Sequence, residues 1–124
     1  MKFYEAMCEI KGTQKMFTVI SGGCYASVYR FTKDGNGLVR SDLWYALVDR
    51  YWLPVYFNCG EWFNNSVVKA DCIILNDLED LYRLYKSRGG EMSHVEERLK
   101  LARKYGVINK AEHQRLWEVL NDNK

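Results

Sequence analysis

The stretch CYASVYRFTKDGNGLVR, residues 24–40, decides the first half of the fold. Its side chains alternate between two faces, with Cys24, Ala26 and Val28 on one and Tyr25, Ser27, Tyr29 and Phe31 on the other. This period of two is typical of a β-strand over residues 24–32. Residues 34–37, Asp-Gly-Asn-Gly, contain two dipeptides that favour positive φ and therefore predict a tight turn. Residues 38–40 can pair back briefly onto this strand, which would make a short hairpin.

The sequence on either side extends this hairpin into a larger sheet. Residues 3–10 place Tyr4, Ala6, Cys8 and Ile10 on one parity, which predicts a strand, and residues 16–20 predict another. Two β-rich runs, residues 55–58 and 67–75, predict two strands after the hairpin. Residues 42–52 show helical spacing of apolar side chains, with Ser41 as the cap and Pro54 as the limit. We therefore expect an antiparallel sheet of about five strands with one crossing helix.

Three further helices are predicted after this sheet, over residues 77–88, 94–105 and 110–121. Each start carries a capping residue followed by Glu three positions later, in the pairs Asn76 and Glu79, Ser93 and Glu96, and Asn109 and Glu112. Gly106 is expected to end the second helix in the left-handed conformation. The predicted fold class is α+β. We expect a single domain over residues 1–124, with a sheet-rich portion at 1–76 and a helical portion at 77–124.

Composition narrows the function mainly by exclusion. The chain has 124 residues, 48% hydrophobic and 27% charged, which are ordinary values for a globular protein. Its formal net charge of +2 is too small for the strong positive field of a dedicated duplex-DNA binder. The sequence shows no run of eighteen apolar residues and no secretory signal pattern. We therefore expect no membrane partner and a cytoplasmic protein.

Residues able to hold a metal or perform catalysis are present but scattered. The four cysteines form no C-x-x-C pair, and both histidines, His94 and His113, lie far from them in sequence. We expect no metal, no cofactor and no disulfide, with Cys8, Cys24 and Cys72 in the sheet core. A different interpretation is a small enzyme that uses Cys59 with His113 as its base, or carboxylates among Asp34, Asp49, Glu61 and Asp71. No spacing joins either set, so catalysis is not expected.

The aromatic content of 15% is the unusual feature of the composition. Four large side chains gather around Pro54 and two turns, and they form the candidate partner-binding residues Tyr51, Trp52, Trp62 and Phe63. Tyrosine and tryptophan are enriched at the energetic centres of protein interfaces. An alternative is single-stranded nucleic-acid binding by stacking on one strand face, with Tyr25, Tyr29 and Phe31 under the bases and Arg30 and Lys33 near the phosphates.

Residues 96–120 resemble the short C-terminal helical hairpins that are appended to other domains for oligomerisation. The positions that carry the resemblance are Leu99, Gly106, Ile108, Glu112 and Leu116. The resemblance covers about a fifth of the chain. The resemblance is compatible with a homo-oligomer that forms through this hairpin, and no further function is inferred from it.

These observations favour a small non-catalytic protein that binds a macromolecular partner, with a protein as the first partner and nucleic acid as the second. By analogy of size and composition, we expect an inhibitor or adaptor of the kind that phages and mobile elements encode to block host defence, acting like an anti-CRISPR protein. The charge of +2 favours covering a protein surface over mimicking nucleic acid.

Overall fold

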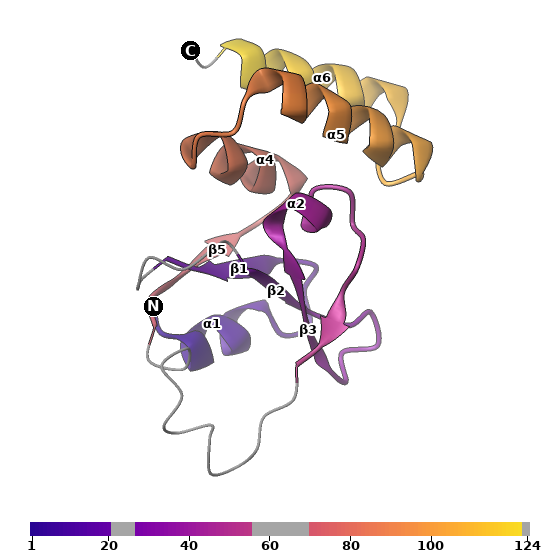
Figure 1. The fold of residues 1–124 in the computed structure, drawn as a ribbon. Coiled ribbons are helices and arrows are strands. Elements are labelled where there is room, and N and C mark those ends of the chain that lie inside the picture. Colours follow the sequence, from indigo (N-terminus) through magenta and orange to yellow (C-terminus); the bar gives the residue numbers. More distant parts are fainter. Residues whose placement is uncertain (21–26, 56–69, 123–124) are drawn as a thin grey trace.

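The computed structural model describes residues 1–20, 27–55 and 70–122, and it confirms the α+β class. Five antiparallel strands form one sheet in the order β4-β3-β2-β1-β5 (Figure 1). The strands are β1 (Met16–Val19), β2 (Ser27–Phe31), β3 (Leu38–Asp42), β4 (Leu53–Pro54) and β5 (Cys72–Leu75). The described helices are α1 (Phe3–Ile10), α2 (Leu43–Ala46), α4 (Leu78–Ser87), α5 (Met92–Lys104) and α6 (Lys110–Asp122). A helix follows β3 and three helices end the chain, as the sequence predicts.

Strands β2 and β3 form an antiparallel hairpin across the predicted turn, and β3 is longer than the brief pairing expected of residues 38–40. Its register places Phe31 opposite Leu38 and Arg30 opposite Val39. In the turn, Gly35 has a φ of 76°, a conformation that side-chain-bearing residues rarely adopt. The Asp34 carboxylate accepts hydrogen bonds from the Thr32 hydroxyl and from the backbone N–H of Asn36. These contacts fix the turn that joins the two strands.

Residues 3–10 form helix α1, so the predicted strand there is wrong. Phe3, Ala6 and Ile10 are fully buried and lie on one helical face, while Tyr4 and Cys8, expected to point inward, are exposed. This segment fits both periods, because apolar side chains fall at positions 3, 6 and 10 as well as at alternate positions. One apolar face of the sheet has to be buried, and α1 packs against it (Figure 1).

Helix α2 is shorter than the predicted segment 42–52. Asp42 caps it by accepting a 2.9 Å hydrogen bond from the backbone N–H of Trp44, in place of Ser41. Helix α2 ends at Ala46, and the chain that follows passes through Asp49 and Tyr51, which both have positive φ. The two-residue β4 precedes the strand predicted at 55–58, of which residues 56–58 lie outside the described residues, and β5 confirms the end of the strand predicted at 67–75. Residues 56–69 lie outside the described residues.

The C-terminal helices begin close to the predicted positions, but their caps differ in detail. Asn109 and Glu112 form the expected reciprocal pair, with the side chain of each accepting from the backbone N–H of the other. At α4 the capping side chain is Asp77. Ser93 caps nothing, because α5 begins at Met92, two residues before the predicted start, and Ser93 lies inside its first turn. Gly106 has a φ of 77° and follows the C-cap residue of α5, Tyr105, in the expected left-handed conformation.

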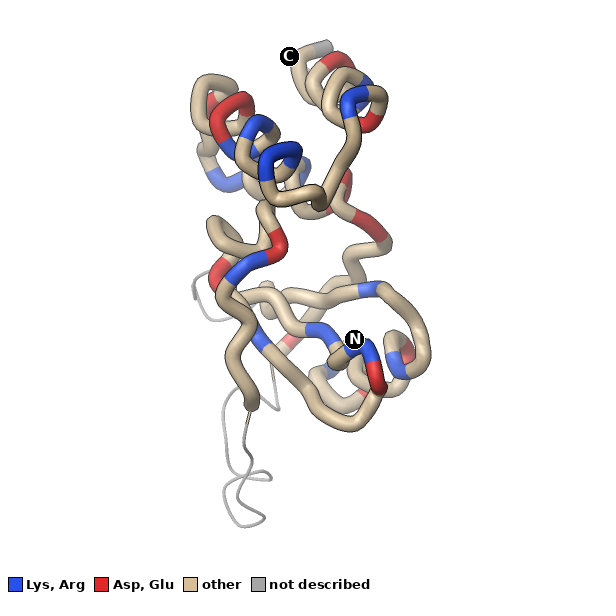
Figure 2. Tube along the Cα trace, turned by 90° about the vertical axis from the view of Figure 1, so that its right-hand side faces the viewer, with Lys and Arg blue, Asp and Glu red and all other residues tan. Residues whose placement is uncertain are grey.

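Two apolar clusters lie on opposite faces of the sheet. The cluster beneath α1 contains Phe3, Phe17, Tyr29 and Cys72, whereas the cluster on the other face joins Met16, Val28 and Leu75 to the helices. Helix α4 lies between the sheet and the α5–α6 pair (Figure 1). In side view, basic and acidic positions are interspersed along these helices (Figure 2).

The apolar positions of the C-terminal hairpin face the protein's own core. Leu99, Ile108 and Leu116 are buried in the larger cluster together with residues of the sheet. These are three of the positions that carry the resemblance to oligomerising hairpins. The C-terminal helices therefore pack on the rest of the chain, and a homo-oligomer would have to use other side chains of the hairpin.

Candidate functional site

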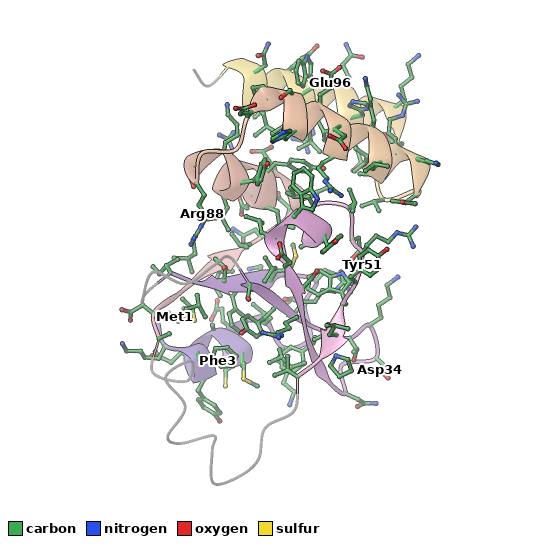
Figure 3. All side chains as sticks on the ribbon, viewed as in Figure 1. Met1, Phe3, Asp34, Tyr51, Arg88 and Glu96 are labelled. Atoms are coloured by element: carbon green, nitrogen blue, oxygen red, sulfur yellow. The ribbon has the colours of Figure 1, made fainter. Side chains whose placement is uncertain are left out.

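An exposed aromatic surface lies where the chain passes from α2 to β4. It consists of Tyr45, Tyr51 and Leu53, whose exposed fractions are 42%, 69% and 59%. The rings of Tyr45 and Tyr51 meet edge to face with their centroids 4.6 Å apart. Figure 3 shows Tyr51 on the flank of the molecule between the sheet and the C-terminal helices. We call these three residues the aromatic surface.

A cavity of about 400 Å³ opens beside the aromatic surface. Besides those three residues, its lining consists of Ser27, Arg40, Ser41 and Asp42. It thus combines two aromatic rings and an aliphatic side chain with one cation, one carboxylate and two hydroxyl groups. Ligand sites have this composition, in which apolar side chains supply contact area and a few polar groups fix orientation.

The loop that carries Tyr51 is held in an unusual backbone conformation. Asp49 and Tyr51 have φ values of 54° and 59°, in the left-handed region that is unfavourable for residues other than glycine. Such conformations persist only where the surrounding contacts enforce them, and they are frequent at binding sites. Several contacts of this loop involve Asp49.

Asp49 binds the sheet and the loop together through its carboxylate. The carboxylate lies 2.9 Å from Nη1 of Arg30 on β2 and accepts a 2.7 Å hydrogen bond from the indole N–H of Trp52. The Arg30 guanidinium also stacks over the Trp52 ring at 4.2 Å. In addition, the hydroxyl of Ser41 donates to the backbone carbonyl of Arg50. The loop is therefore preorganised, with Trp52 turned toward the core and Tyr51 toward solvent.

The structure separates the predicted partner-binding residues. Tyr51 is highly exposed, Trp52 is partly buried against the larger cluster, and Trp62 and Phe63 lie outside the described residues. Sequence reasoning missed Tyr45 and Leu53. The signal for Tyr45 was its place off the apolar stripe of the predicted helix, which leaves a large ring facing solvent.

The sheet residues of the nucleic-acid alternative are occupied by other contacts. Tyr29 is only 5% exposed and packs against the rings of Phe3 and Phe17, at centroid distances of 5.0 and 5.2 Å. Phe31 packs on the same cluster, and Arg30 is engaged by Asp49. Lys33 is exposed, and Tyr25 lies outside the described residues. Because α1 covers this face, bases cannot stack on Tyr29 in this structure.

The cysteines described by the structure have opposite environments. Cys72 is buried, as expected, and its burial raises the thiol pKa to about 11. Cys8 is exposed on α1 and not in the sheet core, since its segment is a helix and not a strand. Cys24 and Cys59 lie outside the described residues.

Two of the acidic residues considered for catalysis are stabilised in their charged form. The hydrogen bond from Thr32 lowers the pKa of Asp34, and the hydrogen bond and charge of Lys2 lower the pKa of Asp71. A general acid needs a raised pKa to remain protonated near neutral pH. Neither carboxyl group therefore has the protonation behaviour of a catalytic acid.

Two findings concern the described residues as a whole. No three His, Cys, Asp or Glu side chains among residues 1–20, 27–55 and 70–122 gather as metal ligands would. Within the same ranges, every helix is too short or too polar to cross a membrane.

Arg98 is 9% exposed and stacks 3.5 Å from the ring of Trp44, and its Nε has no hydrogen-bond partner among the described residues. Burial lowers the pKa of its guanidinium.

Comparison with known proteins found no matching family model, no matching curated protein and no matching solved structure.

Proposed function

We propose that this is a non-catalytic binding protein that docks a protein partner through the aromatic surface. The observation that carries the proposal is Tyr51, a tyrosine that is 69% exposed although its backbone is held in a strained conformation by Asp49, Arg30 and Trp52. A fixed aromatic side chain loses little entropy when a partner covers it. Holding a large apolar ring in solvent has no benefit for the packing of this chain.

The chemistry around the aromatic surface suits a polypeptide better than a polyanion. Its cavity is lined by Arg40 and Asp42, so both signs of charge are offered at close range. Tyr45 and Tyr51 supply the apolar contact area and two hydroxyl groups for hydrogen bonds. Interfaces between proteins commonly combine an aromatic centre with a mixed polar rim.

We propose that the protein acts as an inhibitor or an adaptor by covering a surface of its partner. Small accessory proteins of phages and mobile elements that block host defence act in this way, and the size and the charge of +2 support the assignment by analogy. A cytoplasmic location belongs to the same proposal.

The test is capture of the partner from the native host, followed by affinity measurement with matched variants. Tyr51→Ala removes the central ring, and Tyr4→Ala removes a tyrosine of similar exposure, 61%, from α1 on the opposite face of the sheet. We expect Tyr51→Ala to weaken binding by about tenfold or more and Tyr4→Ala to leave it unchanged. Equal affinities of the two variants, or recovery that nuclease treatment abolishes, would contradict the proposal.

A further inference from the structure

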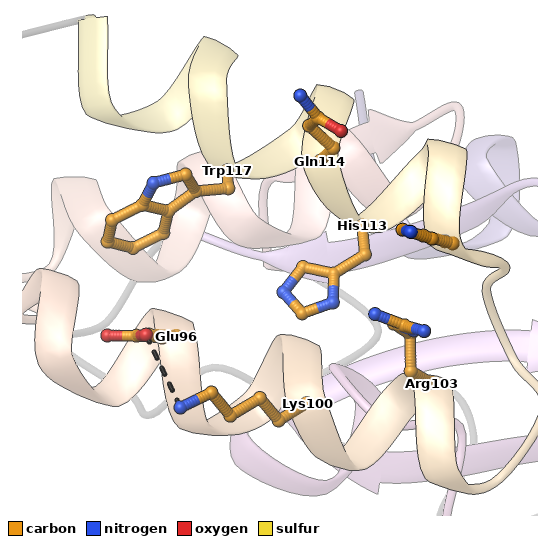
Figure 4. A pocket seen from close by; sticks show the side chains of 7 residues that line it. Glu96, Lys100, Arg103, His113, Gln114 and Trp117 are labelled. Carbon is orange, nitrogen blue, oxygen red and sulfur yellow. Dashed lines mark ion pairs between the residues drawn. The ribbon is translucent and has the colours of Figure 1, made fainter.

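A second cavity, of about 250 Å³, lies between α5 and α6 (Figure 4). Three basic side chains line it, Lys100 and Arg103 from α5 and Lys110 from α6. Its remaining lining includes His113 and Trp117 from α6 and Glu96 from α5. We call this the hairpin groove. Spacings of three and four residues along each helix bring these side chains to the facing sides of α5 and α6.

The hairpin groove carries uncompensated positive charge. Glu96, its one acidic side chain, lies 3.4 Å from Lys100 and offsets that charge. Arg103 and Lys110 have no ion pair with any residue that the structure describes. Among the residues that line the groove three are basic and one is acidic, so the groove has an excess of positive charge. An anion entering it would be attracted by two free cations.

His113 adds a polar ring without adding a charge. Burial lowers the pKa of its imidazole, and the nearby charges of Arg103 and Lys100 lower it further, so the ring is neutral at pH 7. Its Nδ1 is buried and has no hydrogen-bond partner in the described chain. The close view shows the Arg103 guanidinium beside this ring (Figure 4). Buried polar atoms without partners are rare in structural side chains.

Trp117 provides a flat apolar surface at the other end of the groove (Figure 4). The combination of cations with an indole matches a ligand that carries a phosphate next to a planar ring. Single-stranded nucleic acid has this chemistry, because its bases stack on aromatic side chains while Lys and Arg bind its backbone. A volume of about 250 Å³ is below the usual range of pockets for complete small ligands, so it fits one phosphate with part of its nucleotide.

We propose that the hairpin groove binds a phosphate group of a single-stranded nucleic acid. Arg103 and Lys110 neutralise the phosphate, and Trp117 contacts the neighbouring base. This site is independent of the aromatic surface and lies on different elements. It also differs from the sheet face considered from the sequence, which α1 covers. A carboxylate-bearing peptide would satisfy the cations but would offer no ring to Trp117.

The first experiment follows the ring signals of the two histidines by NMR while ligand is added to the full chain. His94 is the internal control, because it lies beside Tyr85 and Trp44 and does not line the groove. We expect inorganic phosphate, and at lower concentration a ten-nucleotide oligothymidylate, to shift the His113 signal to saturation and to leave His94 unchanged. Failure of the oligonucleotide to shift His113 overturns the proposal, even if inorganic phosphate does so.

The second experiment compares two lysine variants for oligonucleotide affinity. Lys110→Gln removes a groove cation, and Lys104→Gln removes an exposed lysine at the end of α5 that does not line the groove. We expect Lys110→Gln to weaken binding by about tenfold and to reduce its salt dependence, whereas Lys104→Gln changes affinity by less than about twofold. Equal losses in both variants would mean non-specific attraction, and equal binding of a decaglutamate peptide would assign the groove to acidic peptides. Either result refutes the proposal.

Discussion

The strain at Tyr51 can be measured by comparing glycine with alanine at the same position. Both substitutions remove the contact with Tyr45, so its energy cancels in the comparison. An L-residue pays about 1–2 kcal/mol for the left-handed conformation, which glycine does not. Glycine instead increases the conformational entropy of the unfolded chain, which lowers the stability of the folded protein by about 0.4–1 kcal/mol relative to alanine. With the φ of 59°, we expect Tyr51→Gly to be more stable than Tyr51→Ala by about 0.5–1 kcal/mol.

The assay is urea unfolding followed by circular dichroism, with the same pair of substitutions at Tyr45 as the control. Tyr45 lies in α2, where glycine should be less stable than alanine by about 1 kcal/mol. The order of stability should therefore reverse between the two positions. If glycine is the less stable substituent at both, Tyr51 is not held in the left-handed conformation. The preorganisation that supports the aromatic surface would then be refuted.

The remaining predictions concern groups away from that surface. Arg98→Met should raise the free energy of unfolding by about 1 kcal/mol, because it removes a buried Nε without a partner; a lower free energy in urea melts would contradict this. The hydrogen bond from Arg115, followed by that from Arg83, lowers the pKa of Glu79 in the folded protein. The ionised carboxylate therefore stabilises the fold above the pKa that Glu79 has in the unfolded chain, and this stabilisation is lost as the pH falls through the pKa of the folded state. Glu79→Gln should accordingly lower the free energy of unfolding at pH 7 but not at a pH below the pKa of the folded state. Urea melts at both pH values measure this, and a difference between variant and wild type that persists in acid would contradict the explanation. At pH 8 a thiol reagent should modify Cys8 quickly and Cys72 only on unfolding, as peptide mapping would show, and equal rates would contradict the burial of Cys72.

The parts of the fold that sequence predicts correctly are those with local causes. The β2–β3 hairpin follows from the turn at residues 34–37, and α6 follows from the reciprocal cap of Asn109 and Glu112. Residues 3–10 could not be decided locally, because their apolar positions satisfy the periods of both a strand and a helix. Only the need to cover Phe17 and Tyr29 on the sheet selects the helix.

The candidate site was partly predictable for the same reason. The turns around Pro54 indicate that a nearby aromatic residue emerges, and Tyr51 does so. Whether Trp52 or Tyr51 faces solvent depends on the ion pair between Asp49 and Arg30, which are distant in sequence. The hairpin groove likewise depends on how α5 packs against α6 and has no signal in either helix alone.

The position of β1 in the sheet has a consequence for synthesis of the chain. Its two neighbours are β2, which follows directly, and β5, which is made much later. With roughly 50 residues between Val19 and Cys72, translation at about 5–20 residues per second leaves the second edge of β1 without its partner for about 3–10 s. During that interval the nascent chain exposes a strand edge able to pair with other chains. Slow translation or a delay before residues 72–75 should therefore increase aggregation of the newborn protein.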